Sequence, residues 1–380
     1  MEKILIINTK YRQHGGEDTN ILEEIKFLKK NYEVKYLEFN NLGKLNFSDA
    51  LSLITGSNIQ SNKKVTDAIN SFKPNIAYVH NTWFRANLGI FRILNKNNVK
   101  TYLKIHNYRY FCANFLLLKN HISSGTFCNM CSMKKNFGLF NKYYQNSYLK
   151  SFILIMYGKR YINLIKSTKV NLLVMTQHHR KFMINNGFNK NSIHIYRNPV
   201  TLNKLNSYNL DSEYIVYAGR LSSDKGILEL IKSWQEANVG NLVLKIIGEG
   251  NLFKSLEERN YQNIELMGEL SHEETLSLIK NARGVVTATK MFEGQPRLLC
   301  EASSYGVPSL FPDFGGMGEF FPQGYQLKFD QFNYLDLSKK IAIFKDKKML
   351  ENLSQEVYDF VNKELNDKKL SETFSSLLLN

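Results

Sequence analysis

Two glutamates at a loop-to-helix transition are the residues of this chain best placed to do chemistry. Glu293 and Glu301 lie in the segment 285–301, VVTATKMFEGQPRLLCE, where an apolar β-type run gives way to a helix-like one. Gly294 allows close backbone approach, and Pro296 favours the first turn of a helix. A helix that begins here directs unpaired N–H groups at the loop, where they attract phosphate. With Glu301 about one turn inside, both carboxylates can face one ligand, as in a site for a sugar nucleotide.

A second loop offers two cations. Arg220 and Lys225 follow a strand-like run at residues 214–218, in the motif YAGRLSSDKG. Ser222 or Asp224 can cap the helix that comes next. Fixed cations at one place stabilise the negative charge of a departing nucleoside diphosphate. The alternative is an ordinary solvated pair at the start of a helix.

Three motifs, taken in order, resemble the retaining glycosyltransferases of glycosyltransferase family 4. They are residues 217–226, the pair Glu293-x7-Glu301, and residues 314–319, FGGMGE. The resemblance implies the GT-B fold, in which two Rossmann-like α/β domains face each other across a cleft. It also implies transfer of a sugar from a nucleotide-sugar donor with retention of configuration.

The resemblance also assigns roles to residues. Arg220 and Lys225 would bind the donor diphosphate, Glu301 the ribose hydroxyls and Glu293 the transferred sugar, as one of two catalytic residues. In this chain Gln295 and Pro296 replace the second glycine and the hydrophobic residue that are usual in the loop. The residues implied in binding the donor sugar and ribose are Glu293, Gly294, Gln295, Leu298, Leu299 and Glu301.

The first half of the chain contributes two further candidates. Gly15 and Gly16 follow the first strand and would let the backbone close over the sugar–phosphate; a plain strand–helix turn is the alternative. His106 follows an apolar run, and the resemblance implies a catalytic contact with the donor sugar near the anomeric centre. A satisfied core histidine is the alternative for His106.

Charge is distributed very unevenly along the chain. Residues 1–200 carry 30 Lys and Arg against 9 Asp and Glu, a net charge of +21, whereas residues 201–380 carry a net −5. No acidic residue lies between Asp67 and Asp211. A basic first domain indicates an anionic partner, namely membrane lipid, a lipid-diphosphate acceptor or nucleic acid. With few carboxylates available as a base (Glu17 and Asp18 remain), the pattern favours a leaving diphosphate that itself accepts the acceptor's proton.

The segment 133–169 is basic and aromatic, with an apolar run at residues 152–157 between Lys150 and Lys159. Such a segment can lie in a membrane interface, where aromatic side chains sit at headgroup depth and cations meet anionic lipid. The alternative is a buried helix with a basic outer side.

Cysteine usage indicates a reducing compartment, because four unevenly placed cysteines form no disulfide framework. Cys112, Cys128 and Cys131 have spacing suited to a structural zinc, with His106 or His121 as fourth ligand; reduced thiols bracing a long loop are the alternative. No catalytic metal set and no cofactor is expected, since Gly248-Glu-Gly250 lacks the third glycine of a dinucleotide fingerprint.

Alternating strand-like and helix-like runs predict two α/β domains. The boundaries expected are 1–198 for an acceptor-binding domain, 199–362 for a nucleotide-sugar-binding domain, and 363–380 for a helix that crosses back to the first. Strand-like runs lie at 4–8, 34–39, 76–80, 99–107, 171–176, 193–196, 214–218, 242–247, 264–267, 284–289, 308–311 and 325–329. Helix-like runs lie at 19–30, 86–97, 177–186, 226–236, 252–258, 272–281 and 297–305, with polar helical segments from residue 334 onward.

The sequence thus predicts a hexosyltransferase-type glycosyltransferase (EC 2.4) that moves a sugar, from a UDP-sugar by preference, to a glycan or lipid-linked acceptor of surface polysaccharide biosynthesis. Because no uncharged apolar run has the length of a membrane span and the N-terminus is expected to be a strand rather than a signal peptide, we expect a cytoplasmic protein, peripheral at the inner face of the cell membrane. One alternative is a sugar-nucleotide epimerase of GT-B fold. Another is a non-enzymatic protein that binds polyanions or nucleic acid through its basic half, although this leaves Glu293 and Glu301 unexplained; nucleic acid is not an expected partner.

Overall fold

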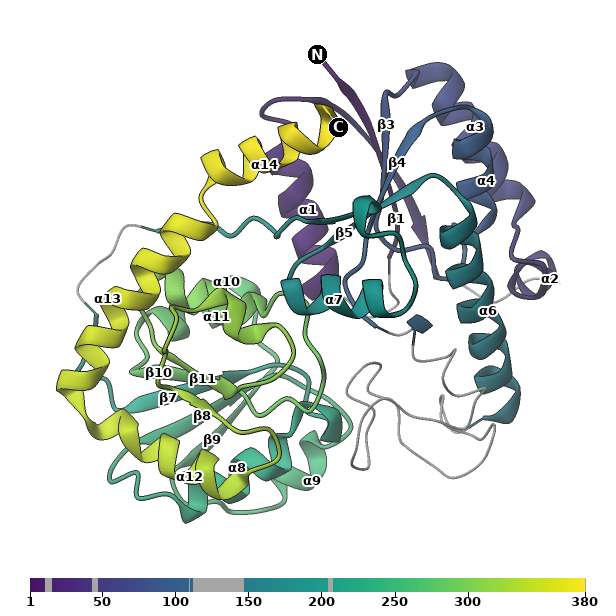
Figure 1. Ribbon diagram of the computed structural model, residues 1–380. Helices are drawn as coiled ribbons and strands as arrows, with labels where there is room; N and C mark the ends of the chain where they lie inside the picture. Colours follow the sequence, from purple (N-terminus) through teal and green to yellow (C-terminus); the bar gives the residue numbers. More distant parts are fainter. Residues whose placement is uncertain (11–15, 43–46, 109, 112–146, 204–207, 380) are drawn as a thin grey trace. The chain divides into compact units, whose positions relative to one another are not determined.

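A computed structural model describes residues 1–10, 16–42, 47–108, 110–111, 147–203 and 208–379 of the chain (Figure 1). The chain forms two compact units. Unit 1 consists of Met1–Pro199 and Thr373–Asn380, and unit 2 of Val200–Glu372. Each unit is built on a parallel six-stranded sheet, so the predicted α/β class is confirmed.

The sheet of unit 1 has the strand order β2-β1-β3-β4-β5-β6. Strand β1 runs through Ile4, Leu5, Ile6 and Ile7, all fully buried, as expected for a central parallel strand covered on both faces. The strands of this sheet are β1 (Lys3–Lys10), β2 (Glu33–Asn40), β3 (Ile76–Val79), β4 (Lys100–Lys104), β5 (Val170–Val174) and β6 (Ile193–Ile195).

The helices of unit 1 include two that the sequence patterns missed, α2 and α3. Helix α3 buries only a narrow stripe around Val65, Ala68 and Ile69 and is otherwise polar, so few apolar residues mark it in the sequence. Asn58 caps it by accepting a hydrogen bond from the N–H of Ser61. The helices of this unit are α1 (Gly16–Leu28), α2 (Phe47–Thr55), α3 (Ile59–Phe72), α4 (Gly89–Lys96), α6 (Tyr148–Ser167) and α7 (Gln177–Asn185).

The last residues of the chain belong to unit 1. Phe374 is buried, and its ring centroid lies 5.2 Å from that of Tyr196 and 5.6 Å from that of Tyr32. Tyr102 donates a hydrogen bond to the carbonyl of Leu377. The end of α14 (Asp367–Leu379), yellow in Figure 1, is therefore part of the first core.

The sheet of unit 2 has the order β12-β11-β10-β7-β8-β9, so β7 and β10 are neighbours although the strands β8 and β9 and their helices lie between them in sequence. Its strands are β7 (Tyr214–Ala218), β8 (Val243–Ile247), β9 (Ile264–Gly268), β10 (Gly284–Val286), β11 (Ser309–Pro312) and β12 (Lys328–Phe329). Its helices are α8 (Ile227–Glu236), α9 (Phe253–Glu257), α10 (His272–Lys280), α11 (Arg297–Ser304), α12 (Tyr334–Ile341) and α13 (Lys347–Glu364). No described helix is long and apolar enough to cross a membrane.

Candidate functional site

The loops that carry the predicted donor-binding residues leave the same edge of the unit 2 sheet. Strands β7 and β10 pair in parallel, with Val285 opposite Val216, so the loops that follow them emerge side by side. The N–H of Lys290 donates to the carbonyl of Asp224 (3.0 Å) and joins the two loops. Gly226 has a φ of +69°, and a Cβ there would lie 1.9 Å from the carbonyl oxygen of Ala288. Only glycine permits this approach.

The first contact at this edge joins two predicted site residues. Lys225 Nζ lies 2.6 Å from Glu293 Oε1. The hydroxyl of Thr289 donates to the same oxygen at 3.1 Å. The predicted diphosphate cation and the predicted sugar-binding carboxylate therefore meet directly.

Arg220, the second predicted cation, is held by its own loop. Its Nη2 lies 2.6 Å from Asp224 Oδ2, and its Nε donates to the hydroxyl of Ser222 at 3.0 Å. Ser222 and Asp224 thus bind Arg220 and do not cap the following helix, contrary to expectation. Helix α8 instead begins after Gly226, which makes no side-chain cap bond.

Glu301 lies on α11, as predicted, and is nearly buried. Arg297 Nε donates to Glu301 Oε1 at 2.7 Å, and His272 Nε2 lies 3.3 Å from the same oxygen. Arg297 and His272 were missed in the sequence. The i,i+4 spacing of Arg297 and Glu301 was a readable signal, whereas His272 begins α10 and comes close only through tertiary packing.

The loop before α11 has the expected order. Helix α11 begins at Arg297, where the helix-like run was predicted to begin, and Pro296 lies just before it. Gln295 and Leu299 are buried, and the N–H of Leu299 donates to the carbonyl of Pro296 at 3.0 Å. Gly294 is also buried, while Leu298 is only partly so.

The glycines after β8 have a packing role. A Cβ on Gly248 would lie 2.2 Å from the carbonyl oxygen of Gly219, and one on Gly250 would lie 2.3 Å from that of Leu221. Both glycines therefore let the loop after β8 press against the loop that holds Arg220.

His106 in unit 1 lies two residues beyond β4, and His80 follows the neighbouring strand β3. His106 Nε2 and His80 Nδ1 are 3.0 Å apart, so one ring donates to the other. Burial, with the charge of Lys104 as a smaller cause, lowers the pKa of His106 to about 3. The imidazole is therefore neutral at physiological pH and can exchange hydrogen bonds without carrying charge.

A buried ion pair connects β4 to α1. Lys104 Nζ lies 2.9 Å from Glu24 Oε1, both side chains are fully buried, and Tyr78 donates to the same carboxylate at 2.7 Å. Burial lowers the pKa of Lys104, and the nearby charge of Glu24 opposes that shift. Because breaking such a pair leaves a buried charge, it fixes α1 firmly on the sheet.

Several predicted residues lie outside the described residues. Gly15 is one, although Gly16 begins α1. Cys112, Cys128, Cys131 and His121 are the others, so the zinc prediction stays untested. Among the residues described, no group of three or more His, Cys, Asp or Glu is placed to hold a metal ion.

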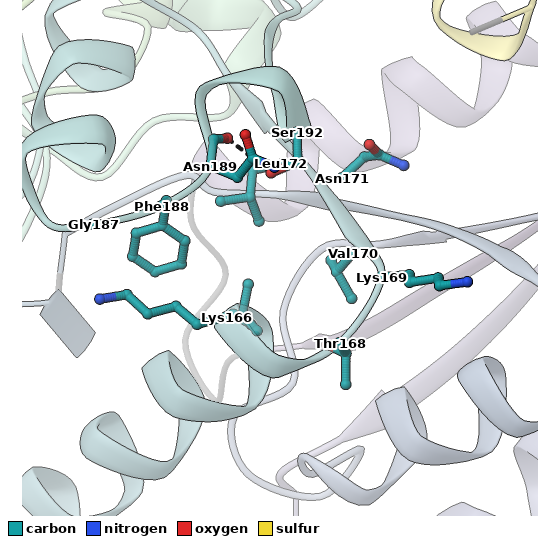
Figure 2. A pocket seen from close by; sticks show the side chains of 11 residues that line it. Lys166, Thr168, Lys169, Val170, Asn171, Leu172, Gly187, Phe188, Asn189 and Ser192 are labelled. Atoms are coloured by element: carbon teal, nitrogen blue, oxygen red, sulfur yellow. Dashed lines mark hydrogen bonds between the residues drawn. The ribbon is translucent and has the colours of Figure 1, made fainter.

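A cavity of about 380 Å³ in unit 1 is distinct from all of these residues (Figure 2). It lies at the amino ends of β5 and β6, whereas ligands of parallel α/β sheets bind at the carboxyl ends. Of its two lysines, Lys166 donates to the carbonyl of Asn186 at 2.6 Å and lies over the Phe188 ring. The Lys166 ammonium is thus bonded within the fold.

Comparison with known protein families bears on the site in unit 2. Residues 203–360 match the model of the family described as glycosyl transferases group 1. The second unit is similar to group 1 glycosyltransferases. The matched region contains Arg220, Lys225, Glu293 and Glu301. The narrower assignment to family 4, with its Glu-x7-Glu motif, stays a prediction.

A curated relative matches part of the chain. The amylovoran biosynthesis glycosyltransferase AmsD of Erwinia amylovora is 25% identical over 148 residues. This match covers 37% of the chain and 42% of the relative, so the chain matches less than half of that relative's length.

Solved structures share the fold over nearly the whole chain. Anabaena Alr3699/HepE in complex with UDP and glucose has a TM-score of 0.71 at 12% identity, covering 100% of this chain and 99% of that one. Sucrose-phosphate synthase from Thermosynechococcus elongatus has a TM-score of 0.72 at 12% identity, covering 99% and 98%. These likenesses confirm the predicted GT-B fold.

Proposed function

We propose that the protein is a retaining glycosyltransferase of EC class 2.4 that transfers a hexosyl group from a nucleotide sugar, a UDP-sugar by preference. One observation carries the proposal. The region that matches the group 1 family includes the edge of the unit 2 sheet at which Lys225, Arg220 and Glu293 lie on neighbouring loops. Complexes of Anabaena Alr3699/HepE with UDP and with UDP-glucose support the choice of donor.

The residues of this edge suit a diphosphate that gains charge as it leaves. Arg220 and Lys225 would stabilise that charge, because cations already in place at the site need little reorganisation as the charge develops. Glu301 would bind the ribose, and Glu293 would bind the transferred sugar once the diphosphate engages Lys225.

Retention, as proposed here, requires the acceptor to attack the face of the sugar from which the diphosphate leaves. The bond between the anomeric carbon and the diphosphate oxygen breaks, and the acceptor oxygen bonds to the same face of the sugar. The leaving diphosphate takes the acceptor's proton, in keeping with the absence of acidic residues between Asp67 and Asp211. His106, neutral through burial, would contribute a hydrogen bond to the sugar.

We further propose a lipid-linked or polyanionic glycan acceptor in surface polysaccharide biosynthesis, used by a cytoplasmic protein at the inner face of the membrane. The net charge of +21 over residues 1–200 supports an anionic partner. Helix α6 adds apolar surface, since Leu149 is 68% and Phe152 49% exposed, next to the exposed Lys150. Other residues of the same apolar run, such as Ile155, are buried in the core.

Thermal unfolding with a panel of nucleoside diphosphates and nucleotide sugars tests the donor site. One base should raise the Tm, since a ligand at a hundred times its Kd stabilises by about 2.7 kcal/mol. Glu301→Ala should abolish the shift and Arg220→Ala should reduce it. Glu236→Ala is the matched control, because Glu236 is a carboxylate of α8 that pairs at 3.7 Å with the exposed Lys232.

The other outcomes point elsewhere. No shift with any nucleotide, alongside a large shift with polyanions, would leave a basic binding protein. Conversion of the donor to a new sugar nucleotide without any acceptor would indicate the epimerase.

A further inference from the structure

The side chains of Glu301, Arg297 and His272, from two helices of unit 2, each contact the other two. Arg297 Nε donates to Glu301 Oε1 at 2.7 Å, and His272 Nε2 lies 3.3 Å from that oxygen. Arg297 Nη2 in turn lies 3.3 Å from His272 Nε2. The side chains of Arg297 and Glu301 are only 14% and 9% exposed, so this contact is shielded from water far more than an ordinary surface pair.

These contacts leave one carboxylate oxygen for a ligand. Both neighbours of the Glu301 carboxylate lie at Oε1, and among the described residues no hydrogen bond to Oε2 is found. An arginine on the same helix restricts rotation of the Glu301 side chain, because its planar fork is held in a fixed orientation. An acceptor oriented in advance loses less conformational entropy when a hydroxyl binds to it.

The same arginine also offsets an unfavourable charge. A bare carboxylate beside a diphosphate raises the free energy of the complex, and the repulsion is strong where the site is shielded. Arg297 neutralises Glu301 at contact distance. The carboxylate can then accept hydrogen bonds from sugar hydroxyls without repelling the phosphates of the same ligand.

We infer that Arg297 is the positioning residue that directs Glu301 Oε2 to the ribose hydroxyls, and that it thereby makes the site select ribonucleotides over deoxyribonucleotides. The inference rests on the proposed function, since it takes the ligand to be a nucleotide. His272 supports Arg297 from the start of α10.

Isothermal titration with UDP, 2′-deoxy-UDP and 3′-deoxy-UDP tests this assignment. The wild-type protein should prefer UDP over at least one deoxy form by roughly tenfold to a hundredfold, the range expected for a hydrogen bond to a charged group. In Arg297→Gln the ratio of the two affinities, UDP over the deoxy form, should fall toward one. Arg297→Lys keeps the charge but not the planar guanidinium, and it should lose most of the preference for UDP. Arg259→Gln, an exposed arginine of the same unit, should keep the wild-type ratio.

A double variant distinguishes a loss of ribose selectivity from a loss of protein stability. Glu301→Gln with Arg297→Gln leaves no unpaired carboxylate and should show the same ratio as Glu301→Gln alone. If Arg297→Gln weakens UDP and both deoxy forms equally, Arg297 contacts the diphosphate directly and the inference is wrong. If the wild-type protein binds neither UDP nor ADP nor GDP, the proposed function fails and the inference fails with it.

Discussion

At the scale of single residues, Lys225 is the cation whose partner a bound diphosphate would replace, because it is already paired with Glu293. Its contact with Glu293 is about a quarter exposed on both sides, and ion pairs of that kind contribute about 0–1 kcal/mol. A hydrogen bond between charged groups in a diphosphate site contributes about 1.5–3 kcal/mol. A diphosphate should therefore displace Glu293, which becomes available to the sugar.

If a diphosphate replaces Glu293 as the partner of Lys225, substitutions of these two residues should have opposite effects on the affinity for UDP. Glu293→Gln removes the competitor, so it should bind UDP as tightly as wild type or a few-fold more tightly, while transfer to acceptor falls strongly. Lys225→Ala should weaken UDP by roughly tenfold or more. Titration calorimetry and initial rates, measured on the same preparations, separate binding from transfer. Weaker UDP binding in Glu293→Gln would show that this carboxylate does not compete for Lys225.

At the scale of elements, parallel pairing determines which residues can meet. Arg220 and Lys225 follow β7, Glu293 follows β10, and the two strands are neighbours. In unit 1 the pairing of β3 with β4 brings His80 to His106 in the same way. Each site therefore consists of loops from adjacent strands, held on a rigid sheet.

Helix α6 carries the prediction for the membrane. Leu149→Ser combined with Phe152→Ser should reduce binding to vesicles rich in anionic lipid, because each large apolar side chain contributes about 1.5–3 kcal/mol when it leaves water. Leu335→Ser, a 72% exposed leucine of unit 2, should have no effect. Flotation at low and high salt measures both the apolar and the electrostatic contributions. Equal binding to neutral vesicles, or no loss in the double variant, would argue against this surface.

At the scale of the whole molecule, the strongly basic first half contains histidines that are kept neutral. Burial lowers the pKa of His106 and of His179 to about 3, from an ordinary value of 6.5. Burial also lowers the pKa of His80, with His106 as a further cause. Between pH 6.5 and 3 the unfolded chain binds protons that these folded rings do not, so the free energy of unfolding falls as the pH drops through that window.

Acid sensitivity is thus an expected property of unit 1. The Tm should decrease steadily from pH 7 to pH 4, and His179→Phe should make the decrease shallower, since the His179 ring packs against Tyr108 with centroids 4.2 Å apart and a phenyl ring fits there without titrating. Scanning calorimetry across this pH range measures the slope. Identical slopes in both proteins would mean that the folded His179 ring takes up protons in this window as readily as the unfolded chain does, and would contradict the prediction.

Most of the fold could be predicted because hydrophobic periodicity is a local property of the chain. The apolar runs at 4–8 and 76–80 predicted β1 and β3 closely. Helix α2 was missed, and so was α3, which is mostly polar and has few apolar residues to mark it. Strand β10 ends at Val286, earlier than the run to residue 289 suggested, since the chain there turns to bring Thr289 to Glu293.

The sequence by itself determined the two α/β units, the order of the motifs and the candidate residues Arg220, Lys225, Glu293 and Glu301. These depend on residue type and on spacing along the chain, which are local. Only the tertiary structure decided the partners, namely Lys225 for Glu293 and Arg297 with His272 for Glu301. Lys225 and Glu293 lie on loops after different strands, and His272 and Glu301 on different helices, so the packing of the sheet and its helices is what brings them together.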